Sequence, residues 1–270
     1  MKFSFSTVAL SALSLVSGVL ALVTGSLDVH DPTMCRDSAG KWFLFSTGVG
    51  IPIRTSTDRL TGPGRSVWSP GQATWITPYT GGTDKDIWAP DCTYKNGQFY
   101  LYYATSTFGS RNSAIFFAKS STGLPGSWSH QGQVLATSTS NDYNAIDPNL
   151  IIGDGNNWWL TFGSYWSGIK LPSTGKPSSS TVYSIAKRTA GGGAVEAPIL
   201  VKNGNYYYLF TSWDKCCSGT SSPTMFALGA LLGWANAKLD YVFVFILTSP
   251  YSITGPYVDQ AGVALTSGGG

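Results

Sequence analysis

The chain has 270 residues, enough for one large domain with a substantial core. Charged residues make up only 11%, against roughly 25% in an average globular domain. The net charge of +3 and the lack of any Lys/Arg cluster in the sequence exclude nucleic acid as a partner. Aromatic residues reach 14%, and many Gly, Ser and Thr accompany them, which is typical of a β-rich protein; flat aromatic faces beside hydroxyl groups also suit sugars.

The N-terminus reads MKFSFSTVALSALSLVSGVLALVTGS, one Lys followed by an apolar stretch with small residues. Val19–Ala21 resembles a signal-peptidase site. A membrane anchor is the alternative, but the apolar run is short and is interrupted by Ser and Gly. We therefore expect residues 1–21 to be a signal peptide. Residues 22–270 would then form a single extracellular domain with no membrane contact.

Four cysteines are present, namely Cys35, Cys92, Cys216 and Cys217. An even number in an oxidising compartment permits disulfides, but the sequence leaves their connectivity open. A bridge between the adjacent Cys216 and Cys217 would close a strained ring. Zinc is not expected, because there is no CxxC motif and the only histidines are His30 and His130.

One pattern occurs four times along the chain: a proline, a short strand, a Gly-containing turn and an aromatic strand. It begins at His30, Trp88, Ile146 and Glu196. Gly flanked by apolar runs is a strong hairpin signal. The four expected turns are Ala39-Gly40, Asn96-Gly97, Asp154-Gly155 and Asn203-Gly204.

The spacing of this pattern predicts a β-propeller. The aromatic strands start at Trp42, Phe99, Trp158 and Tyr206, which are 57, 59 and 48 residues apart. The segments from Ser113 and Ser180 would supply outer strands. A β-sandwich is the alternative, but it would not require the proline and the turn to recur in phase.

Carboxylates accompany three of the four prolines. Asp31 precedes Pro32, Asp147 precedes Pro148, and Glu196, the only glutamate of the chain, stands two residues before Pro198. The first strand of each propeller blade lines the central axis, so these acids should meet at one mouth of the channel. One carboxylate could then act as a general base, one as a general acid, and a third could raise the pKa of the acid, as an inverting glycosidase requires. The alternative is that Asp-Pro merely begins a strand.

The phrases HDP, WAPD, AIDPNL and EAP resemble glycoside hydrolase family 43. The longer stretches DIWAPDCTYKNGQFYLYYATSTFGSRNSAI and NAIDPNLIIGDGNNWWLTFGSYWSGI are similar to its endo-1,5-α-L-arabinanases, and the resemblance covers Val29 to Gly219. It implies a five-bladed propeller that cleaves internal α-1,5 bonds of arabinan with inversion. By the same resemblance Asp31 is the general base, Glu196 the general acid and Asp147 the modulator of the acid's pKa.

The resemblance also implies substrate contacts. The aromatic candidates are Trp88, Phe108 and Trp166, and the polar candidates are Asn144 and Ser164. Endo action is inferred only from the likeness of two segments, Ser106–Ile115 and Ser164–Ile169. An exo-acting arabinofuranosidase or β-xylosidase of the same family is one alternative. A catalytically inactive carbohydrate-binding propeller is another, and a structural interaction propeller a third.

After Gly219 the sequence departs from this family, and SITGPYVDQAGVALTSGGG returns to it. We interpret residues 223–249 as a mistranslated intron, so that the last blade is incomplete and the natural product continues past Gly270; a genuine variant with an unusual fourth blade is the alternative. The family often carries a calcium ion near the axis beside a histidine of the fifth blade. That histidine is absent from this sequence, so the cofactor stays open. We expect a monomer.

Overall fold

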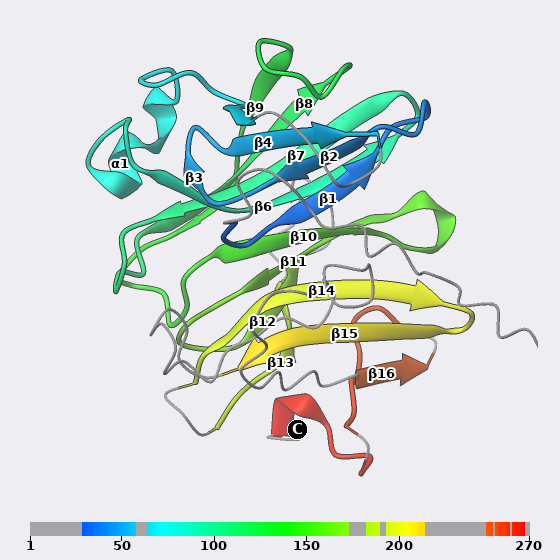
Figure 1. The fold of residues 1–270 in the computed structure, drawn as a ribbon. Helices are drawn as coiled ribbons and strands as arrows, with labels where there is room; N and C mark the ends of the chain where they lie inside the picture. Colours follow the sequence, from blue (N-terminus) through cyan, green and yellow to red (C-terminus); the bar gives the residue numbers. More distant parts are fainter. Residues whose placement is uncertain are drawn as a thin grey trace, which may run out of the picture.

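The computed structural model describes residues 29–57, 64–172, 182–189, 193–213, 247–250, 252–259 and 261–267. These residues form antiparallel sheets that, apart from β3, follow one another in chain order (Figure 1). Several predictions concern other parts of the chain. The expected signal peptide, residues 223–246 of the atypical segment, and both Cys216 and Cys217 lie outside the described residues.

The first two sheets come from the N-terminal half. The first has the order β1-β2-β4-β5 and consists of β1 (Thr33–Arg36), β2 (Trp42–Phe45), β4 (Pro52–Ser56) and β5 (Gly64–Ser66). The second has the order β3-β6-β7-β8-β9 and consists of β3 (Gly48–Val49), β6 (Asp86–Lys95), β7 (Gln98–Ser106), β8 (Ser113–Ser120) and β9 (Trp128–Thr137). A 3-10 turn (Thr74–Ile76) and the short α1 (Thr77–Thr80) precede β6.

The next two sheets contain the remaining strands. The third has the order β10-β11-β12-β13 and consists of β10 (Ile146–Ile152), β11 (Trp158–Gly163), β12 (Ile169–Pro172) and β13 (Val182–Ala186). The fourth has the order β14-β15-β16 and consists of β14 (Val195–Asn203), β15 (Tyr206–Trp213) and β16 (Leu247–Pro250). Two further 3-10 turns span Asp154–Asn156 and Leu265–Ser267.

The predicted hairpins are β1–β2, β6–β7, β10–β11 and β14–β15, one in each sheet. Their second strands begin at Trp42, Gln98, Trp158 and Tyr206, within one residue of the expectation. In the second sheet Asn96 and Gly97 both have positive φ, at 51° and 75°, as a two-residue turn of type I′ requires. The predicted outer strand from Ser113 is β8, and the one from Ser180 is β13.

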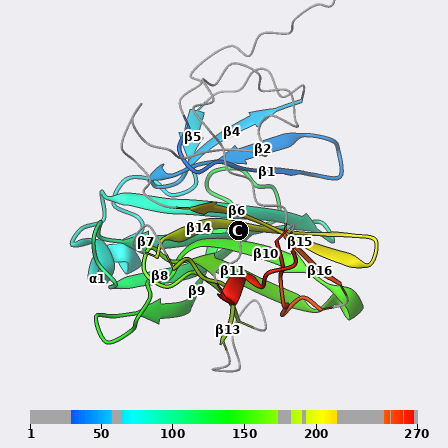
Figure 2. The ribbon, with the colours of Figure 1, turned by 90° about the horizontal axis from the view of Figure 1, so that it is seen from below.

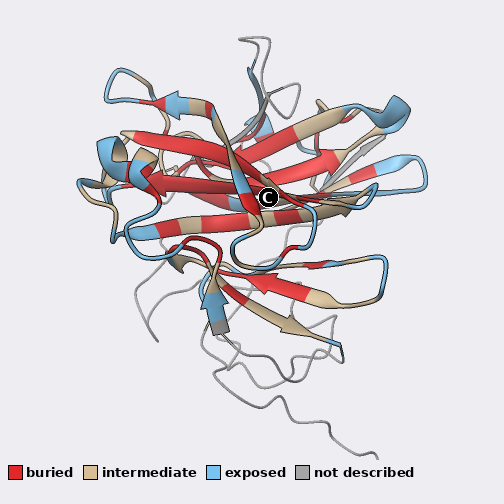
Figure 3. Ribbon diagram, turned by 90° about the horizontal axis from the view of Figure 1, so that it is seen from above, coloured by how far each residue is buried: buried red, intermediate tan, exposed pale blue. Residues whose placement is uncertain are grey.

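The first strands of the four sheets lie in sequence against one another, β1 with β6, β6 with β10, and β10 with β14. Figure 2, seen from below, shows β1 and β2 in a layer next to the one that contains β6, β10 and β14. The apolar cores fill the spaces between neighbouring sheets, so buried residues occupy the middle of the strands and exposed residues the loops at their ends (Figure 3). Sheets packed around a shared set of first strands are the blades of a propeller.

In the first three blades, the polar residue directly after the proline links one blade to the next. Thr33 Oγ1 accepts a hydrogen bond from the Cys92 N–H at 3.2 Å, and Asp91 Oδ2 accepts one from Leu150 at 2.7 Å. Asn149 Oδ1 accepts the equivalent bond from the Leu200 N–H at 2.9 Å. The fourth blade has Ile199 at this position, which cannot accept a hydrogen bond.

The first two blades are also joined covalently. Cys35 of β1 and Cys92 of β6 form a disulfide with a Cα–Cα distance of 5.7 Å. This selects one of the connectivities that the sequence left open for these two cysteines. No helix among the described residues has the length and apolar character needed to cross a membrane.

Part of the C-terminal region packs onto the third and fourth blades. Ile253, Tyr257 and Leu265 are buried in the same core as β13, β14 and β15. The Lys187 N–H donates to the Leu265 carbonyl at 3.2 Å, and β16 pairs with β15. The stretch that returns to family-like sequence therefore belongs to the folded core.

Candidate active site

The four prolines mark one end of the first strands, and the residue before each has an unusual backbone. Asp31, Ala89, Asp147 and Ala197 have φ of 46°, 40°, 51° and 48°. Non-glycine residues avoid positive φ at a cost of about 1–3 kcal/mol, and such strain clusters at functional sites. In the second, third and fourth blades the strand register also shifts just here, as in a β-bulge. The same local structure thus recurs where the predicted acids stand.

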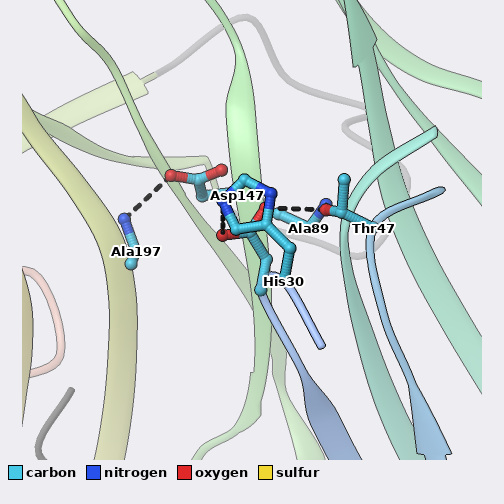
Figure 4. A network of polar contacts seen from close by, with 6 residues as sticks. His30, Thr47, Ala89, Asp147 and Ala197 are labelled. Atoms are coloured by element: carbon cyan, nitrogen blue, oxygen red, sulfur yellow. Dashed lines mark hydrogen bonds and ion pairs between the residues drawn. The ribbon is translucent and has the colours of Figure 1, made fainter. Parts of the chain in front are cut away.

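Asp31 is held from two sides. Thr47 Oγ1 donates to Asp31 Oδ2 at 2.6 Å. His30 Nε2 lies 3.4 Å from Asp31 Oδ1, and the His30 side chain is largely exposed. Figure 4 shows this network.

Asp147 faces the fourth blade. Its Oδ2 accepts a hydrogen bond from the Ala197 N–H at 2.9 Å. Burial, followed by the negative charge of Asp31, raises the pKa of Asp147 to about 7, although the Ala197 N–H opposes this shift. Gly163 of β11 leaves the space for this contact, because a Cβ there would lie 2.9 Å from Glu196 Cα and 3.4 Å from Asp147 Oδ2.

Glu196 is buried, with 9% of its surface exposed. Burial comes first among the causes that raise its pKa to about 8, and the charges of Asp147 and Asp31 add to it. Since both aspartates act on Glu196, the structure brings the three acids together at one site. Glu196 does not, however, occupy the same position as the aspartates, because it stands two residues before its proline and they stand one before theirs. The residue at the equivalent position of the second blade is Trp88, and in the fourth blade the left-handed backbone belongs to Ala197.

The three aromatic candidates come from different blades. Trp88 lies in β6, is partly buried and packs against the core between the second and third blades. Phe108 stands in the loop between β7 and β8 and is 77% exposed, the most exposed large apolar side chain of the described residues. Trp166 lies in the turn after β11, where its ring contacts that of Tyr165.

Asn144 and Ser164, the polar candidates, are buried at 3% and 0% exposure and bond to each other. Ser164 Oγ donates to Asn144 Oδ1 at 3.0 Å and accepts from the Trp166 N–H at 3.1 Å. Asn144 Oδ1 also accepts from the Tyr165 N–H at 2.9 Å. Both side chains therefore hold the turn that carries Trp166. The Ser164 backbone in turn pairs with Val195, the neighbour of Glu196.

Two residues of the site were not predicted from the sequence, Thr47 and Gly163. A signal for Thr47 was present, since each of the four phrases ends in Ser or Thr, at Thr47, Ser106, Ser164 and Ser212. Gly163 offered no such signal. Its part follows from the close approach of β11 to the Glu196 backbone, which the sequence does not show.

The family resemblance implied a calcium ion, which side-chain carboxylates and other oxygens would bind. Within the described ranges, no group of three or more His, Cys, Asp or Glu side chains is placed to hold a metal ion. This part of the chain does not fit a metal held by such side chains.

Two carboxyl groups with raised pKa beside a third, at the strand ends of a propeller, are the kind of groups that glycoside hydrolysis uses. The comparison with known families agrees: the model of glycosyl hydrolases family 43 matches residues 23–266, so the chain belongs to that family. The match extends beyond Gly219, where the resemblance in the sequence ended. The predicted fold, a five-bladed β-propeller, is confirmed by the likeness to solved family 43 arabinanases, and the described residues of this chain form four of its sheets.

Three similar proteins illustrate the relationship. An extracellular endo-α-(1→5)-L-arabinanase of Bacillus subtilis is 40% identical over 250 residues, 90% of this chain and 71% of that protein. An extracellular exo-α-(1→5)-L-arabinofuranosidase of Cellvibrio japonicus is 35% identical over 97% of this chain and 75% of its own length. The structure of a Cellvibrio cellulosa α-L-arabinanase complexed with arabinohexaose has a TM-score of 0.74 at 33% identity, covering 91% of this chain and 78% of that one.

Proposed function

We propose that this protein is a secreted endo-1,5-α-L-arabinanase, which hydrolyses internal α-1,5-L-arabinofuranosidic bonds of arabinan with inversion. The observation that carries the proposal is the placement of the buried Glu196 beside Asp147, whose Oδ2 accepts a hydrogen bond from the Ala197 N–H at 2.9 Å; the charges of Asp147 and Asp31 help to raise the pKa of Glu196. The similarity to named arabinanases supports the choice of arabinan. The extracellular relatives and the Cys35–Cys92 disulfide support secretion.

In this mechanism Asp31 and Glu196 act in one step. The ionised Asp31 takes a proton from water while the water oxygen attacks the anomeric carbon from the face opposite the leaving group. The bond from that carbon to the glycosidic oxygen breaks, and Glu196 gives its proton to the departing oxygen. With a pKa of about 8, Glu196 retains this proton at neutral pH. Proton exchange with solvent then restores both groups.

Asp147 acts on Glu196 through charge and through the backbone. Its charge raises the pKa of Glu196 by like-charge repulsion. Its hydrogen bond to Ala197 fixes the residue that follows the acid. The two acids titrate as a coupled pair, so the pH profile reports the pair.

Aromatic rings supply the sugar contacts in this proposal. Trp88, Phe108 and Trp166 offer flat faces for the C–H surface of arabinofuranose units, and the exposure of Phe108 supports an outer subsite. For Asn144 and Ser164 we propose an indirect part, since their polar atoms bond within the protein and hold the Trp166 turn.

One observation supports the exo-acting alternative, because the C. japonicus relative is named as an exo enzyme. Both alternatives use the same acids and differ in which bond of the polymer they reach. Incubation with linear α-1,5-arabinan separates them: short oligosaccharides of several lengths are expected from endo action, and arabinose or one fixed small product from exo action.

The Glu196→Gln variant tests whether the acids carry the reaction. We expect no products from this variant and retained arabinan binding, because Gln preserves size but has no proton to donate. A folded wild type that binds arabinan without releasing products would instead indicate a carbohydrate-binding propeller. Light scattering of the same preparation tests the expected monomer.

A further inference from the structure

Thr47 joins three segments around Asp31. Its backbone N–H donates to the His30 carbonyl at 2.8 Å. Its hydroxyl oxygen lies 2.6 Å from Asp31 Oδ2 and 2.8 Å from the backbone N of Ala89, which belongs to the second blade. Figure 4 shows Thr47 beside Ala89, with His30 near the same centre. Thr47 therefore links Asp31 to the neighbouring blade.

The direction of these hydrogen bonds is fixed by chemistry. A backbone N–H only donates, so the Thr47 oxygen is the acceptor for Ala89. The single hydroxyl proton then points to Asp31 Oδ2, which can accept it as a carboxylate oxygen. Hydrogen bonds to a charged acceptor are short, and 2.6 Å is in the range for O–H···O⁻. The arrangement matches an ionised Asp31.

The two oxygens of Asp31 are consequently unequal. Oδ2 is occupied by the Thr47 hydroxyl, whereas Oδ1 faces the exposed His30 at 3.4 Å. A carboxylate oxygen that already accepts a strong hydrogen bond is the weaker base, so Oδ1 is the better proton acceptor.

We propose that Thr47 is a positioning residue, which holds the Asp31 carboxylate so that Oδ1 receives the proton of the attacking water. This inference rests on the proposed function, in which Asp31 is the general base. It adds that the second blade sets the orientation of the base through the Ala89 N–H.

The far end of this link is rigid. Ala89 is 8% exposed, has a φ of 40° and precedes Pro90, whose ring limits the backbone at that point. β6 continues directly from there and is tied to β1 by the Cys35–Cys92 disulfide. The Thr47 oxygen is thus held against a fixed donor.

The experiment compares Thr47→Val with Thr47→Ser in the full chain. Val keeps the shape and removes the hydroxyl, and Ser keeps the hydroxyl. We expect Thr47→Val to lower kcat on arabinan by about 10- to 100-fold with little change in KM, since misplacing a reacting group has such effects. Thr47→Ser should retain most of kcat. Thr105→Val is the matched control, because the buried Thr105 hydroxyl has no hydrogen-bond partner among the described residues.

The pH profile distinguishes positioning from a loss of folding. The charged or titratable groups placed around Asp31 in the described residues are His30, Asp147 and Glu196, and Thr47→Val changes none of them. Removing a donor from a carboxylate disfavours its ionised form. The acidic limb of kcat/KM should therefore move to higher pH in Thr47→Val and stay in place in Thr47→Ser and Thr105→Val.

Crystal structures of wild type and Thr47→Val provide a second readout that needs no activity. The Asp31 carboxylate is expected to rotate or to take several orientations in the variant. The inference would be overturned if the Asp31 carboxylate kept its orientation in Thr47→Val. It would also be overturned if the wild type were active and Thr47→Val had the same kcat and pH profile. Inactivity of the wild type on arabinan would contradict the proposed function instead, and the crystallographic comparison would still decide the part of Thr47.

Discussion

The Asp147 carboxylate accepts a hydrogen bond from the backbone N–H of Ala197 at 2.9 Å, and Ala197 is the residue directly after Glu196. One aspartate thus touches the chain beside the acid and also acts on it by charge, since Asp147 raises the pKa of Glu196. Geometry and electrostatics are coupled through a single side chain. A substitution that keeps the hydrogen bond and removes the charge can separate the two.

Asp147→Asn is that substitution. The Asn oxygen can still accept from Ala197, but the negative charge is lost, so the pKa of Glu196 should fall. We expect the alkaline limb of the kcat/KM profile to move to lower pH and kcat to drop by about 10- to 100-fold. An alkaline limb that stays in place would show that Asp147 does not tune the acid.

Gly163→Ala tests the close packing beneath Glu196. The new Cβ would meet Glu196 Cα at 2.9 Å, a backbone contact that cannot be relieved by a side-chain rotation. We expect the acid to shift and kcat to fall by about 100-fold. Gly153→Ala is the control, since Gly153 has a φ of −84° and the nearest atom to its Cβ would be 3.5 Å away. Equal kcat in the two variants would contradict the packing argument.

Glu196→Gln should also change stability with pH. The pKa of Glu196 is raised in the folded state, so folding favours the protonated carboxyl. The contribution of Glu196 to the free energy of unfolding is therefore complete below about pH 4.5 and is lost as the pH rises through about 8. A neutral Gln avoids the loss. We expect the variant to match wild type in acid and to exceed it by a few kcal/mol in alkali, measured as the free energy of unfolding in urea. A difference that does not depend on pH would be inconsistent with a buried acid whose pKa is raised by folding.

The Cys35–Cys92 disulfide should contribute mainly to stability. It closes a sequence separation of 57 residues between the first two blades, and removing such a bridge costs about 2–5 kcal/mol. The double variant Cys35→Ala with Cys92→Ala is therefore expected to unfold at a clearly lower urea concentration. A reductant should have the same effect on wild type, and any effect of reductant on the double variant would come from Cys216 and Cys217. An unchanged unfolding midpoint would exclude a stabilising part for this bridge.

The repetition in the sequence was enough to predict a β-propeller, whereas the number of blades was inferred from the family resemblance. Turn pairs such as Asn96-Gly97 recur in phase with a proline, and each predicts a hairpin. These hairpins place one pair of strands in each blade. The pairing of Cys35 with Cys92 could not be derived, because it depends on how closely β1 approaches β6 across blades. Spacing along the chain does not contain that distance.

The site was predictable as a set of acids and less so in its detail. Asp31 and Asp147 share a position before proline, and Glu196 stands one residue earlier relative to Pro198. This offset is visible in the sequence, but the register shift in β14 that accompanies it is not encoded in a linear pattern. Asn144 and Ser164 illustrate the same limit, because burial decides whether a polar side chain faces a ligand or the protein.

The most direct test of the central claim is the configuration of the first product released from arabino-oligosaccharides. Proton NMR during the first minutes of hydrolysis, before mutarotation, shows which anomer forms. With Asp31 activating water and Glu196 protonating the leaving oxygen, the β-anomer should appear first from the α-linked substrate, and Glu196→Gln should release none. An α-anomer formed first, or turnover that survives in Glu196→Gln, would contradict the account.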